Sequence, residues 1–398
     1  MGYLVAFNRD RDHYQVPVAL AEQGLLSGLV TDYYAGATWP RVPALAHRSD
    51  PALPPELVTT AYRSLAIQAV QQAAVRLGLK VPHPARLSDD LIADRTRRLL
   101  RHDPSSDLFL YSGLAGRIYR QEPGRFRALF QYHPSPRLVR AAMLDDDLLK
   151  DADWLPEPEE ARSAWKERIH DEELEHSDLF FCASSFTRRG LLEEGVPPAR
   201  VRVAPYGCAP VSSPQTFPDE QAPAVPTFLF VGQGVRRKGL HLLLAAWEAA
   251  ALRSARLRII ASRIDPAIAA RAARSPNVEL SGAVSAAGLR SAMSTADTLV
   301  LPSLVEGFGL VIGEALGSGL RVIASTNTGL VDYGVPAPAG RIVAAGRVHD
   351  LREALVEFAE NFDRSRPYRS AALESARRND WARFRSGIRA GLPTAERN

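Results

Sequence analysis

The amino-acid sequence predicts an α/β protein with two parallel sheets, each covered by helices on both faces. Short apolar runs alternate with amphipathic stretches along the chain, and this alternation is typical of parallel strands buried on both sides. A stretch with five prolines among polar residues, Ala209–Pro226, separates the runs into two groups and is typical of a linker. The chain has 398 residues, which is enough for two or three domains of ordinary size.

The expected domain boundaries follow from this division. We place an N-terminal α/β domain at residues 1–206 and a linker at residues 207–226. A C-terminal α/β domain is expected at residues 227–374, followed by a final helical segment at residues 375–398.

The apolar runs predict the strands, and the amphipathic stretches predict helices. The expected strands are Tyr3–Phe7, Gly28–Thr31, Leu108–Tyr111, Ala128–Tyr132, Leu179–Ala183, Val201–Ala204, Thr227–Val231, Leu257–Ala261, Thr298–Leu301 and Arg321–Ala324. The expected helices are Glu56–Leu79, Leu87–Arg101, Leu240–Ala250, Leu351–Phe362 and Asn379–Ile388.

Composition excludes several classes of protein. A hydrophobic content of 46% with 24% charged residues excludes an intrinsically disordered chain, and a net charge of +4 gives no indication of nucleic-acid binding. The two cysteines, Cys182 and Cys208, are too few for a disulfide framework or a thiolate metal site, so a reducing compartment is expected. Because charges interrupt every long apolar run, we expect a cytoplasmic protein with neither a signal peptide nor a membrane span.

Two clusters of charge lie in the N-terminal half. Such clusters are usually solvated faces, and for the basic one the alternative is a surface that meets anionic lipid headgroups. The acidic run Asp145–Asp147 is expected at an exposed edge of a helix or in a loop, because a metal site needs carboxylates that converge in space. The basic cluster consists of Arg95, Arg97, Arg98, Arg101 and His102.

The segment richest in candidate chemistry follows a predicted strand and reads LPSLVEGFGLVIGEALGSG from Leu301 to Gly319. Glycines 307 and 309 remove side chains where the backbone can approach a ligand, and the helix that follows offers free N–H groups and a positive dipole end. Glu306 precedes this helix and Glu314 lies in its first turns, so both carboxylates are expected to face one cleft. Carboxylates suit the paired hydroxyls of a sugar, because each accepts two hydrogen bonds.

A second segment reads FLFVGQGVRRKG from Phe228 to Gly239 and combines a strand, a glycine turn and a cluster of cations before a helix. Such an arrangement places positive charge over phosphates at a helix N-terminus, and Lys238 is one of only four lysines in the chain. The segment is not a Walker A loop, because no Gly-Lys-Ser or Gly-Lys-Thr occurs. Taken alone, it is also compatible with a plain surface turn.

Together, the segments EGFGLVIGE (Glu306 to Glu314) and GQGVRRKG (Gly232 to Gly239) resemble the retaining GT-B glycosyltransferases, family 4 in particular. The resemblance implies two Rossmann-like domains that face each other across a cleft, with a final helix that crosses back to the first domain. It covers residues 177–390 and is weak before them. Three further segments fit the family: Ser177–Gly207, Gly319–Gly329 and the terminal Asp380-Trp381.

The resemblance also implies roles for single residues. Glu306 would contact the hydroxyls of the donor sugar, Glu314 the ribose hydroxyls and Lys238 the diphosphate. His133, in the segment FQYHP at a strand end, is similar to the family's cleft histidine near the transferred sugar. The remaining donor contacts are expected from Gly232, Gln233 and Arg237 and from the backbone amides of Phe308, Gly309 and Leu310.

The chain departs from the family's pattern at three places. Gln233 stands where the family has an arginine, and Arg236 and Arg237 are the candidates to supply the missing cation. The first strand is followed by NRDRDH, residues 8–13, instead of a glycine pair. Ser262-Arg263 replaces a glycine-rich turn, in a loop that is expected to contribute to specificity.

The expected function is the transfer of a sugar from a nucleotide diphosphate sugar to an acceptor hydroxyl with retention, in polysaccharide, glycolipid or glycoconjugate synthesis. The acceptor is expected to be a sugar, a lipid-linked molecule or a small molecule. We expect no cofactor and no metal, because Lys238, its neighbouring arginines and a helix dipole would stabilise the departing nucleoside diphosphate. The alternatives are a degenerate GT-B subunit that binds a nucleotide or a partner, and a GT-B epimerase or phosphorylase.

Overall fold

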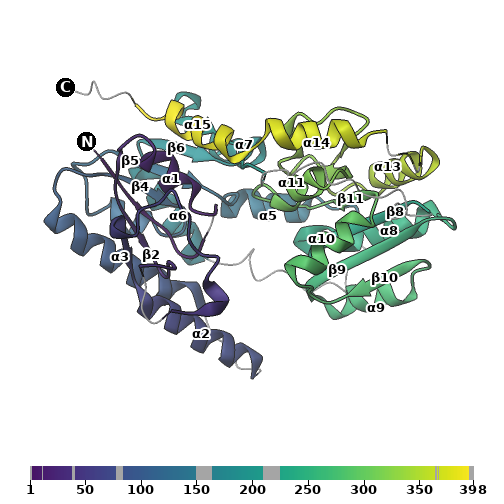
Figure 1. Ribbon diagram of the computed structural model, residues 1–398, viewed down its shortest axis with the longest axis horizontal. Coiled ribbons are helices and arrows are strands. Elements are labelled where there is room, and N and C mark those ends of the chain that lie inside the picture. The colour runs from purple at the N-terminus through teal and green to yellow at the C-terminus, as the bar shows by residue number, and fades with distance from the viewer. Residues whose placement is uncertain are drawn as a thin grey trace.

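The computed structural model describes residues 2–10, 12–37, 41–77, 84–148, 164–208, 225–363, 365 and 367–393. Two parallel sheets form two lobes that lie side by side, with helices around each sheet (Figure 1). The predicted fold class, two Rossmann-like parallel-sheet domains facing each other, is therefore confirmed. Residues 209–224 of the predicted linker lie outside the described residues.

The N-terminal sheet has seven strands in the order β3-β2-β1-β4-β5-β6-β7, and all neighbouring pairs are parallel. The order runs outward on both sides from the neighbours β1 and β4, so the topology reverses between these two strands. The strands are β1 (Tyr3–Ala6), β2 (Leu26–Thr31), β3 (Val58–Thr60), β4 (Asp107–Tyr111), β5 (Arg127–Gln131), β6 (Leu179–Cys182) and β7 (Val201–Val203).

The C-terminal sheet repeats this plan with six parallel strands in the order β10-β9-β8-β11-β12-β13. Its topology reverses between β8 and β11. The strands are β8 (Thr227–Gly234), β9 (Arg256–Ile264), β10 (Val278–Ser281), β11 (Thr298–Leu301), β12 (Arg321–Ser325) and β13 (Gly340–Val343).

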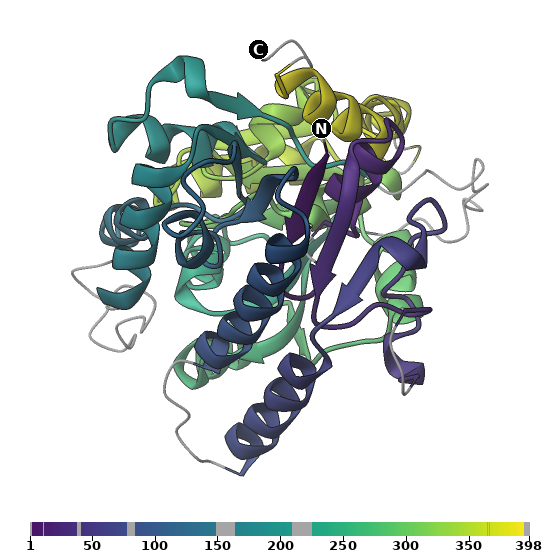
Figure 2. The same cartoon turned by 90° about the vertical axis from the view of Figure 1, so that its left-hand side faces the viewer.

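The helices cover both faces of each sheet, as Figures 1 and 2 show. In the N-terminal lobe they are α1 (Gln15–Ala21), α2 (Tyr62–Arg76), α3 (Pro84–His102), α4 (Gly116–Tyr119), α5 (Pro136–Leu144), α6 (Ala164–His176) and α7 (Ser185–Glu193). The C-terminal lobe carries α8 (Leu240–Ala250), α9 (Pro266–Arg274), α10 (Ala286–Ser294), α11 (Leu310–Gly317), α12 (Leu330–Tyr333), α13 (Val348–Glu360) and α14 (Arg369–Arg378), and the chain continues into the last helix, α15 (Trp381–Gly391). Short 3-10 turns lie at Pro43–Leu45, Pro55–Leu57, Pro198–Arg200 and Arg236–Lys238, the last of which is η7.

Every apolar run that predicted a strand forms one, but three strands were missed. β3, β10 and β13 are short edge strands, and β10 is mostly exposed, so none has the long apolar run of a buried strand. The predicted helix Glu56–Leu79 was wrong at its start, because Val58–Thr60 pairs with β2 and α2 begins only at Tyr62.

Two predicted turns in the C-terminal lobe were also wrong. Gly232 and Gln233 do not form a turn but continue β8, which runs to Gly234 with a register shift between Gly232 and Gly234. Ser262-Arg263 likewise lies within β9, which pairs with β8 as far as Ile264. The cause is mutual: each extension supplies the backbone hydrogen-bonding partner of the other.

The C-terminal helix α15 packs on the N-terminal lobe. Arg385 and Arg389 both pair with Glu22, at the end of α1, and Phe384 packs edge-on against Phe130 at a centroid distance of 6.0 Å. Figure 1 shows α14 and α15 running along the top of the molecule from one lobe to the other. Within the described residues, no helix combines the length and the apolar character that crossing a bilayer requires.

Candidate functional site

Lys238 and Glu306 come together at the reversal point of the C-terminal sheet. Lys238 ends η7, which follows β8, and Glu306 lies in the loop between β11 and α11. Lys238 Nζ donates a hydrogen bond to Glu306 Oε2, and both side chains are largely buried. The two loops therefore place a cation and a carboxylate at the carboxyl ends of adjacent parallel strands, where open α/β sheets bind ligands.

Two glycines allow these loops to pack directly on each other and on a helix end. Gly239 has φ +71°, and a Cβ there would lie 2.0 Å from the carbonyl oxygen of Pro302 in the neighbouring loop. Gly309 has φ +90° and is the N-cap of α11. A side chain would be strained at both positions, so glycine is required for the close approach and for the start of α11.

Charge around Glu306 keeps its carboxylate ionised. Burial raises its pKa, but Lys238, Arg237 and His133 together outweigh burial, so that the net shift is downward. The site therefore holds a buried negative charge that Lys238 and Arg237 balance.

His133 reaches this site from the N-terminal lobe. It follows β5, and its neighbour Tyr132 contacts the loop before α11 so closely that a Cβ on Gly307 would lie 2.3 Å from the Tyr132 carbonyl oxygen. Ser184, the N-cap of α7, donates a hydrogen bond of 2.7 Å to the carbonyl oxygen of Gly307. The catalytic candidates Glu306, Lys238 and His133 are thus assembled by direct contact between the lobes.

Glu314 lies about one turn after the start of α11 and does not join the Lys238–Glu306 pair. The residue is exposed to solvent. Partial desolvation nevertheless raises the pKa of its carboxyl, and His13 of the N-terminal lobe opposes that shift. The imidazole of His13 also meets Trp381 edge-on at 5.8 Å. Glu306 in the loop before α11 and Glu314 within α11 therefore lie at separate places, and the charge of each is influenced by a histidine of the opposite lobe.

Gln233, which stands where the family has an arginine, and the two candidate replacements Arg236 and Arg237 differ in their surroundings. Gln233 is exposed at the end of β8. Arg237 donates to the carbonyl oxygen of Val305 at 3.2 Å, beside Glu306. Arg236 is buried and engages the N-terminal lobe, where its Nε lies 3.5 Å from Asp146 Oδ2. Of the two candidates, Arg237 therefore lies with Lys238 at the site, whereas Arg236 serves the contact between the lobes.

The remaining predicted donor residues form the frame of the site. Phe308 is buried, and its ring packs edge-on against Tyr333 at 5.0 Å and so close to Gly329 that a Cβ there would lie 2.4 Å away. Leu310 is the first residue of α11 and is half-buried. The Phe308 side chain therefore anchors the loop, and a ligand can meet only its backbone amide together with those of Gly309 and Leu310.

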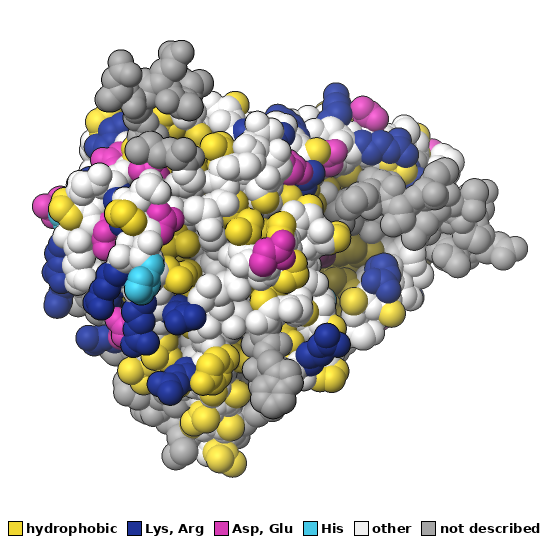
Figure 3. All heavy atoms as spheres, turned by 60° about the vertical axis from the view of Figure 1, so that its left-hand side comes forward, with side chains coloured by type: hydrophobic (Ala, Val, Ile, Leu, Met, Phe, Trp, Pro, Cys, Tyr) yellow, Lys and Arg dark blue, Asp and Glu magenta, His cyan; other side chains and the backbone are white. Residues whose placement is uncertain are grey.

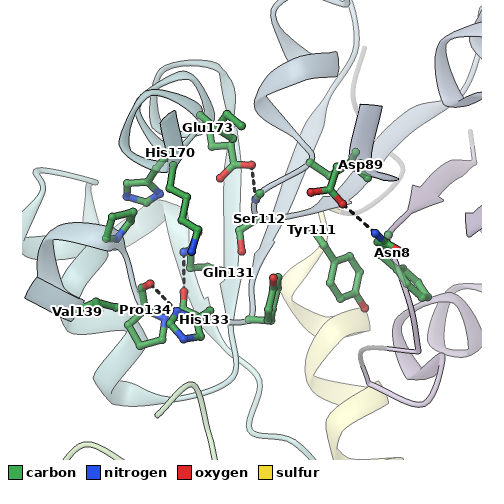
Figure 4. Close-up of a pocket in the computed structure, with 17 residues that line it drawn as sticks. Asn8, Asp89, Tyr111, Ser112, Gln131, His133, Pro134, Val139, His170 and Glu173 are labelled. Atoms are coloured by element: carbon green, nitrogen blue, oxygen red, sulfur yellow. Dashed lines mark hydrogen bonds between the residues drawn. The ribbon is translucent and has the colours of Figure 1, made fainter. Parts of the chain in front are cut away.

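A cavity of about 280 Å³ opens beside His133 in the N-terminal lobe (Figure 4). Residues after β1, β4 and β5 line it together with α6, so it lies at the reversal point of the N-terminal sheet. Gln131 is buried in its wall and donates a hydrogen bond of 2.7 Å to the carbonyl oxygen of His133, while its own Oε1 has no partner among the described residues. The Gln131 side chain is therefore a buried part of the cavity wall that supports the backbone at His133.

Glu173 on α6 is the titratable group most altered by this cavity. Its carboxylate accepts a hydrogen bond of 2.7 Å from the backbone N–H of Gly113, and burial raises its pKa to about 7. Lys166 and His170 lie on the same helix and also line the cavity. Sequence reasoning missed these residues, because α6 has a nearly even distribution of polar side chains and no motif marks its inner face.

The loop that replaces the family's glycine pair is held in a strained conformation. Arg9, His13 and Tyr14 all have positive φ, at 71°, 51° and 63°. Asp32 fastens the start of the loop, accepting from the backbone N–H of Arg9 at 3.1 Å and from Gln68 at 3.1 Å. Side chains from elsewhere in the lobe therefore hold a backbone conformation that glycine would adopt more easily. Arg11 lies outside the described residues.

The acidic run Asp145–Asp147 is not simply an exposed edge, and this expectation was wrong for its central residue. Asp146 is fully buried between the lobes and accepts a hydrogen bond of 2.7 Å from His241 Nε2. Asp145 and Asp147 stay largely exposed and pair with Arg347 of the C-terminal lobe. Among the described residues, no three or more His, Cys, Asp or Glu side chains converge as metal ligands would.

Part of the C-terminal lobe that carries this site resembles known proteins. Residues 225–361 match the family described as Glycosyl transferases group 1. A phosphatidyl-myo-inositol mannosyltransferase of Mycobacterium leprae is 33% identical over 113 residues, and an uncharacterised glycosyltransferase of Methanocaldococcus jannaschii is 27% identical over 113 residues. Each match covers 28% of this chain and only 30% and 32% of the respective relative.

Solved structures extend the likeness to the whole fold. A sucrose-phosphate synthase from Thermosynechococcus elongatus has a TM-score of 0.66 at 16% identity, covering 98% of both chains. The OtsA apo structure has a TM-score of 0.65 at 14% identity over 100% of both chains. WaaG, a glycosyltransferase involved in lipopolysaccharide biosynthesis, has 0.63 at 14% identity, covering 99% of this chain and 100% of WaaG. The GT-B fold that the resemblance in the sequence implies is thereby confirmed.

Proposed function

We propose that this chain, which has the GT-B fold and matches Glycosyl transferases group 1 over residues 225–361, is a retaining glycosyltransferase that uses a nucleotide diphosphate sugar. The observation that carries the proposal is the buried Lys238–Glu306 pair beside the N-terminus of α11 and opposite His133. A cation and a helix N-terminus suit a diphosphate, and an ionised carboxylate suits the hydroxyls of a sugar.

In the proposed reaction, the C-terminal lobe stabilises the departing nucleoside diphosphate. Lys238, Arg237 and the amides at the start of α11 neutralise the charge that develops on its oxygens in a site largely closed to water. Because Lys238 is paired with Glu306, the diphosphate takes over part of this contact and frees Glu306 to accept hydrogen bonds from the sugar. No divalent metal is needed in this scheme.

The acceptor enters the cavity of the N-terminal lobe. This cavity ends at His133, and its volume of about 280 Å³ suits a group of roughly monosaccharide size. The acceptor hydroxyl attacks from the face that the diphosphate leaves, through an oxocarbenium-like state, which gives retention. Its oxygen bonds to the anomeric carbon as the bond from that carbon to the diphosphate oxygen breaks, and its proton passes to the departing oxygen. The proposed acceptor class is a sugar, a lipid-linked molecule or a small molecule.

A ligand screen followed by product analysis tests the proposal. UDP, GDP and ADP, and the sugars that they carry, are added singly to the protein, and a specific ligand raises the melting temperature because it binds only the native state. Proton NMR of the product made with the binding donor then reports the anomeric configuration. A retained configuration and turnover that persists in excess EDTA are expected.

Other results of the same screen contradict the proposal in different ways. Inversion would refute the retaining mechanism, and loss of activity on chelation with recovery in Mg²⁺ would refute the metal-independent one. Nucleotide binding without turnover of any donor over a panel of acceptors would favour a degenerate subunit, the alternative suggested by Gln233. The absence of any nucleotide binding would refute the donor site itself.

We also propose that the hairpin of α2 and α3 touches an anionic membrane surface. Four of the five residues of the basic cluster on α3 are exposed, whereas Arg97 is half-buried and pairs with Asp94 at 3.2 Å. Figure 3 shows Lys and Arg side chains beside apolar ones over the lower part of this lobe. The exposed apolar residues of this region are Tyr62, Val70, Leu77 and Leu87.

Vesicle flotation tests the membrane contact. The protein is expected to float with phosphatidylcholine vesicles that contain phosphatidylglycerol and to stay behind with pure phosphatidylcholine, because each cation near an anionic surface contributes about 1 kcal/mol. The Arg95→Glu/Arg98→Glu variant should lose this binding while its unfolding temperature stays unchanged. Equal recovery from both vesicle types would contradict the electrostatic account.

A further inference from the structure

Helix α5 belongs to one lobe by sequence and to the core of the other by packing. It follows β5 of the N-terminal sheet and lies between the two lobes in Figure 1. Its nine residues span about 13 Å. Its buried side chains share one hydrophobic cluster with Phe228 and Leu240 of the C-terminal lobe, and they are Leu138, Val139, Ala142 and Met143.

The two ends of α5 contact the two loops that carry the proposed donor residues. Before its N-terminus, the Tyr132 carbonyl oxygen lies against Gly307, next to Glu306. After its C-terminus, Asp146 lies against Arg236, two residues before Lys238. One helix therefore brackets the Lys238–Glu306 pair from both sides.

The contact at the C-terminal end is buried and charged. Arg236 is 9% exposed, its Nε lies 3.5 Å from Asp146 Oδ2, and its Nη2 donates a hydrogen bond of 3.3 Å to the carbonyl oxygen of Met143. His241, at the start of α8, donates to the same Asp146 oxygen at 2.7 Å. Burial raises the pKa of Asp146, but His241 and Arg236 outweigh it, so the carboxylate stays ionised.

We propose that Asp146, acting through Arg236, is a positioning residue that aims Lys238 at the donor diphosphate. Successive side chains of a 3-10 turn point about 120° apart, so fixing the direction of one residue of η7 fixes the others. Asp146 fixes Arg236 at the start of this turn, and Gly239, packed on the Pro302 carbonyl oxygen, fixes its end. The role of Lys238 rests on the proposed function, whereas the orientation of η7 does not.

The neighbouring aspartates provide a matched control. Asp145 carries the same charge and also pairs across the lobes, but its side chain is 64% exposed and its partner is Arg347 on a different loop. Exposed ion pairs contribute little to stability. The Asp145–Arg347 pair joins Asp145 to Arg347 and not to a residue of η7. Asp145→Asn therefore removes the same charge as Asp146→Asn without the buried contact to Arg236.

Nucleotide affinity tests the proposal in the full-length protein. Calorimetry is carried out with whichever of UDP, GDP and ADP the wild type binds most tightly. Asp146→Asn and Arg236→Met are each expected to weaken binding about tenfold, and the double variant no more than either single one, because a misaimed cation is lost only once. Asp145→Asn should stay within about twofold of the wild type.

The Lys238→Ala background separates positioning from a general loss of structure. Asp146→Asn should have no further effect on nucleotide affinity there, whereas any change in unfolding temperature should persist. If Asp146→Asn weakened binding equally in both backgrounds, or if it left affinity unchanged in the wild type, the positioning role would be refuted.

Amine labelling tests the orientation of η7 without any nucleotide. The protein is treated with a limiting amount of an N-hydroxysuccinimide ester, and mass spectrometry compares Lys238 with the exposed Lys166. Asp146→Asn should increase labelling of Lys238 relative to Lys166 several-fold, because Lys238 then leaves Glu306, and Asp145→Asn should not. An unchanged labelling ratio in Asp146→Asn would refute the positioning role, whether or not the protein binds a nucleotide. Failure to bind any nucleotide would refute the proposed function but not the orientation of η7.

Discussion

The loop after β1 and the loop after β8 occupy equivalent places in the two sheets, and they are built differently. After β8, the backbone reverses at Gly239, and the loop packs on the Pro302 carbonyl oxygen where no side chain fits. After β1, three non-glycine residues adopt positive φ, and the buried carboxylate of Asp32 accepts a hydrogen bond from the backbone N–H of the first of them, Arg9. One loop presents a cation on a closely packed backbone, and the other presents side chains on a backbone that the rest of the lobe holds in place.

The difference teaches where specificity can vary within one fold. A loop that depends on glycine is restricted at each position by the space around its backbone. A loop held by distant side chains can exchange the residues at its tip while Asp32, Gln68 and Arg48 keep its path. The loop of the proposed donor side is therefore fixed by local sequence, and the loop of the proposed acceptor side is set by contacts across the N-terminal lobe.

The largest expected effect is the loss of the network that holds the loop after β1. Asp32→Ala should lower the free energy of unfolding by roughly 3 to 5 kcal/mol, because it leaves the buried guanidinium of Arg48 without its close partner. Denaturant unfolding measures this effect. Asp94→Ala, which removes the exposed partner of Arg97, should cost less than about 1 kcal/mol. Equal losses in the two variants would contradict the claim that buried side-chain contacts of Asp32 hold the loop after β1.

The next effect is the pH dependence of stability that arises from Glu173, a buried residue that lines the N-terminal cavity. Glu173 has a pKa raised to about 7, so the unfolded chain ionises it above its usual value of 4.5 while the folded chain keeps it protonated. Stability is therefore highest at low pH with respect to this group and falls between about pH 4.5 and pH 7, by roughly 3 kcal/mol at most.

Thermal unfolding of Glu173→Gln against pH measures this contribution. The variant should lose the fall that Glu173 causes, so the difference between variant and wild type should grow from pH 4.5 to pH 7 and then level off. Parallel curves for the two proteins would show that Glu173 titrates normally in the folded state.

Contact between the lobes gives the third expected effect, on turnover. Gly307→Ala should lower the rate of transfer about a hundredfold, because the new methyl group would lie 2.3 Å from the Tyr132 carbonyl oxygen and push His133 away from Glu306. Gly282→Ala is the control, since nothing lies within 4 Å of its added Cβ. Turnover of Gly307→Ala at the rate of the control would mean that the lobes do not need this close approach.

The smallest expected effect returns a cation to the donor side. Gln233→Arg should tighten binding of the nucleoside diphosphate about threefold to tenfold, because the position is exposed and charge there is partly screened. Gln233→Glu should weaken it by a similar factor. If both substitutions left the affinity measured by calorimetry unchanged, Gln233 would not lie near the diphosphate.

Most of the C-terminal lobe was predictable from the sequence, and the reason is the local origin of its signals. Strand, loop and helix follow each other within about twenty residues in both motifs, and Leu240–Ala250 forms the predicted helix without error. The edge strands β10 and β13 were missed there, and so was the pairing of β8 with β9 beyond Val231. That pairing gives no local signal, because each extension is stabilised by the other strand and not by its own apolar residues.

The N-terminal site was much less predictable. His133 was found through the resemblance alone, whereas Glu173, Lys166 and Gln131 meet only because α6 packs beside the end of β5. Asp146 was expected at an exposed edge because its neighbours are acidic, yet the C-terminal lobe buries it against Arg236 and His241. These residues lie far apart in the sequence, so no spacing or period could bring them together.

Nucleoside diphosphate affinity of Glu306→Gln, measured by calorimetry beside the wild type, tests the central claim most directly. The account assigns Glu306 to the sugar and Lys238 to the diphosphate, and the two residues are paired in the structure. Glu306→Gln releases Lys238 from its ionised partner, so affinity should be equal to or higher than that of the wild type, while turnover falls about a hundredfold. A loss of affinity that matches the loss of turnover would contradict the account.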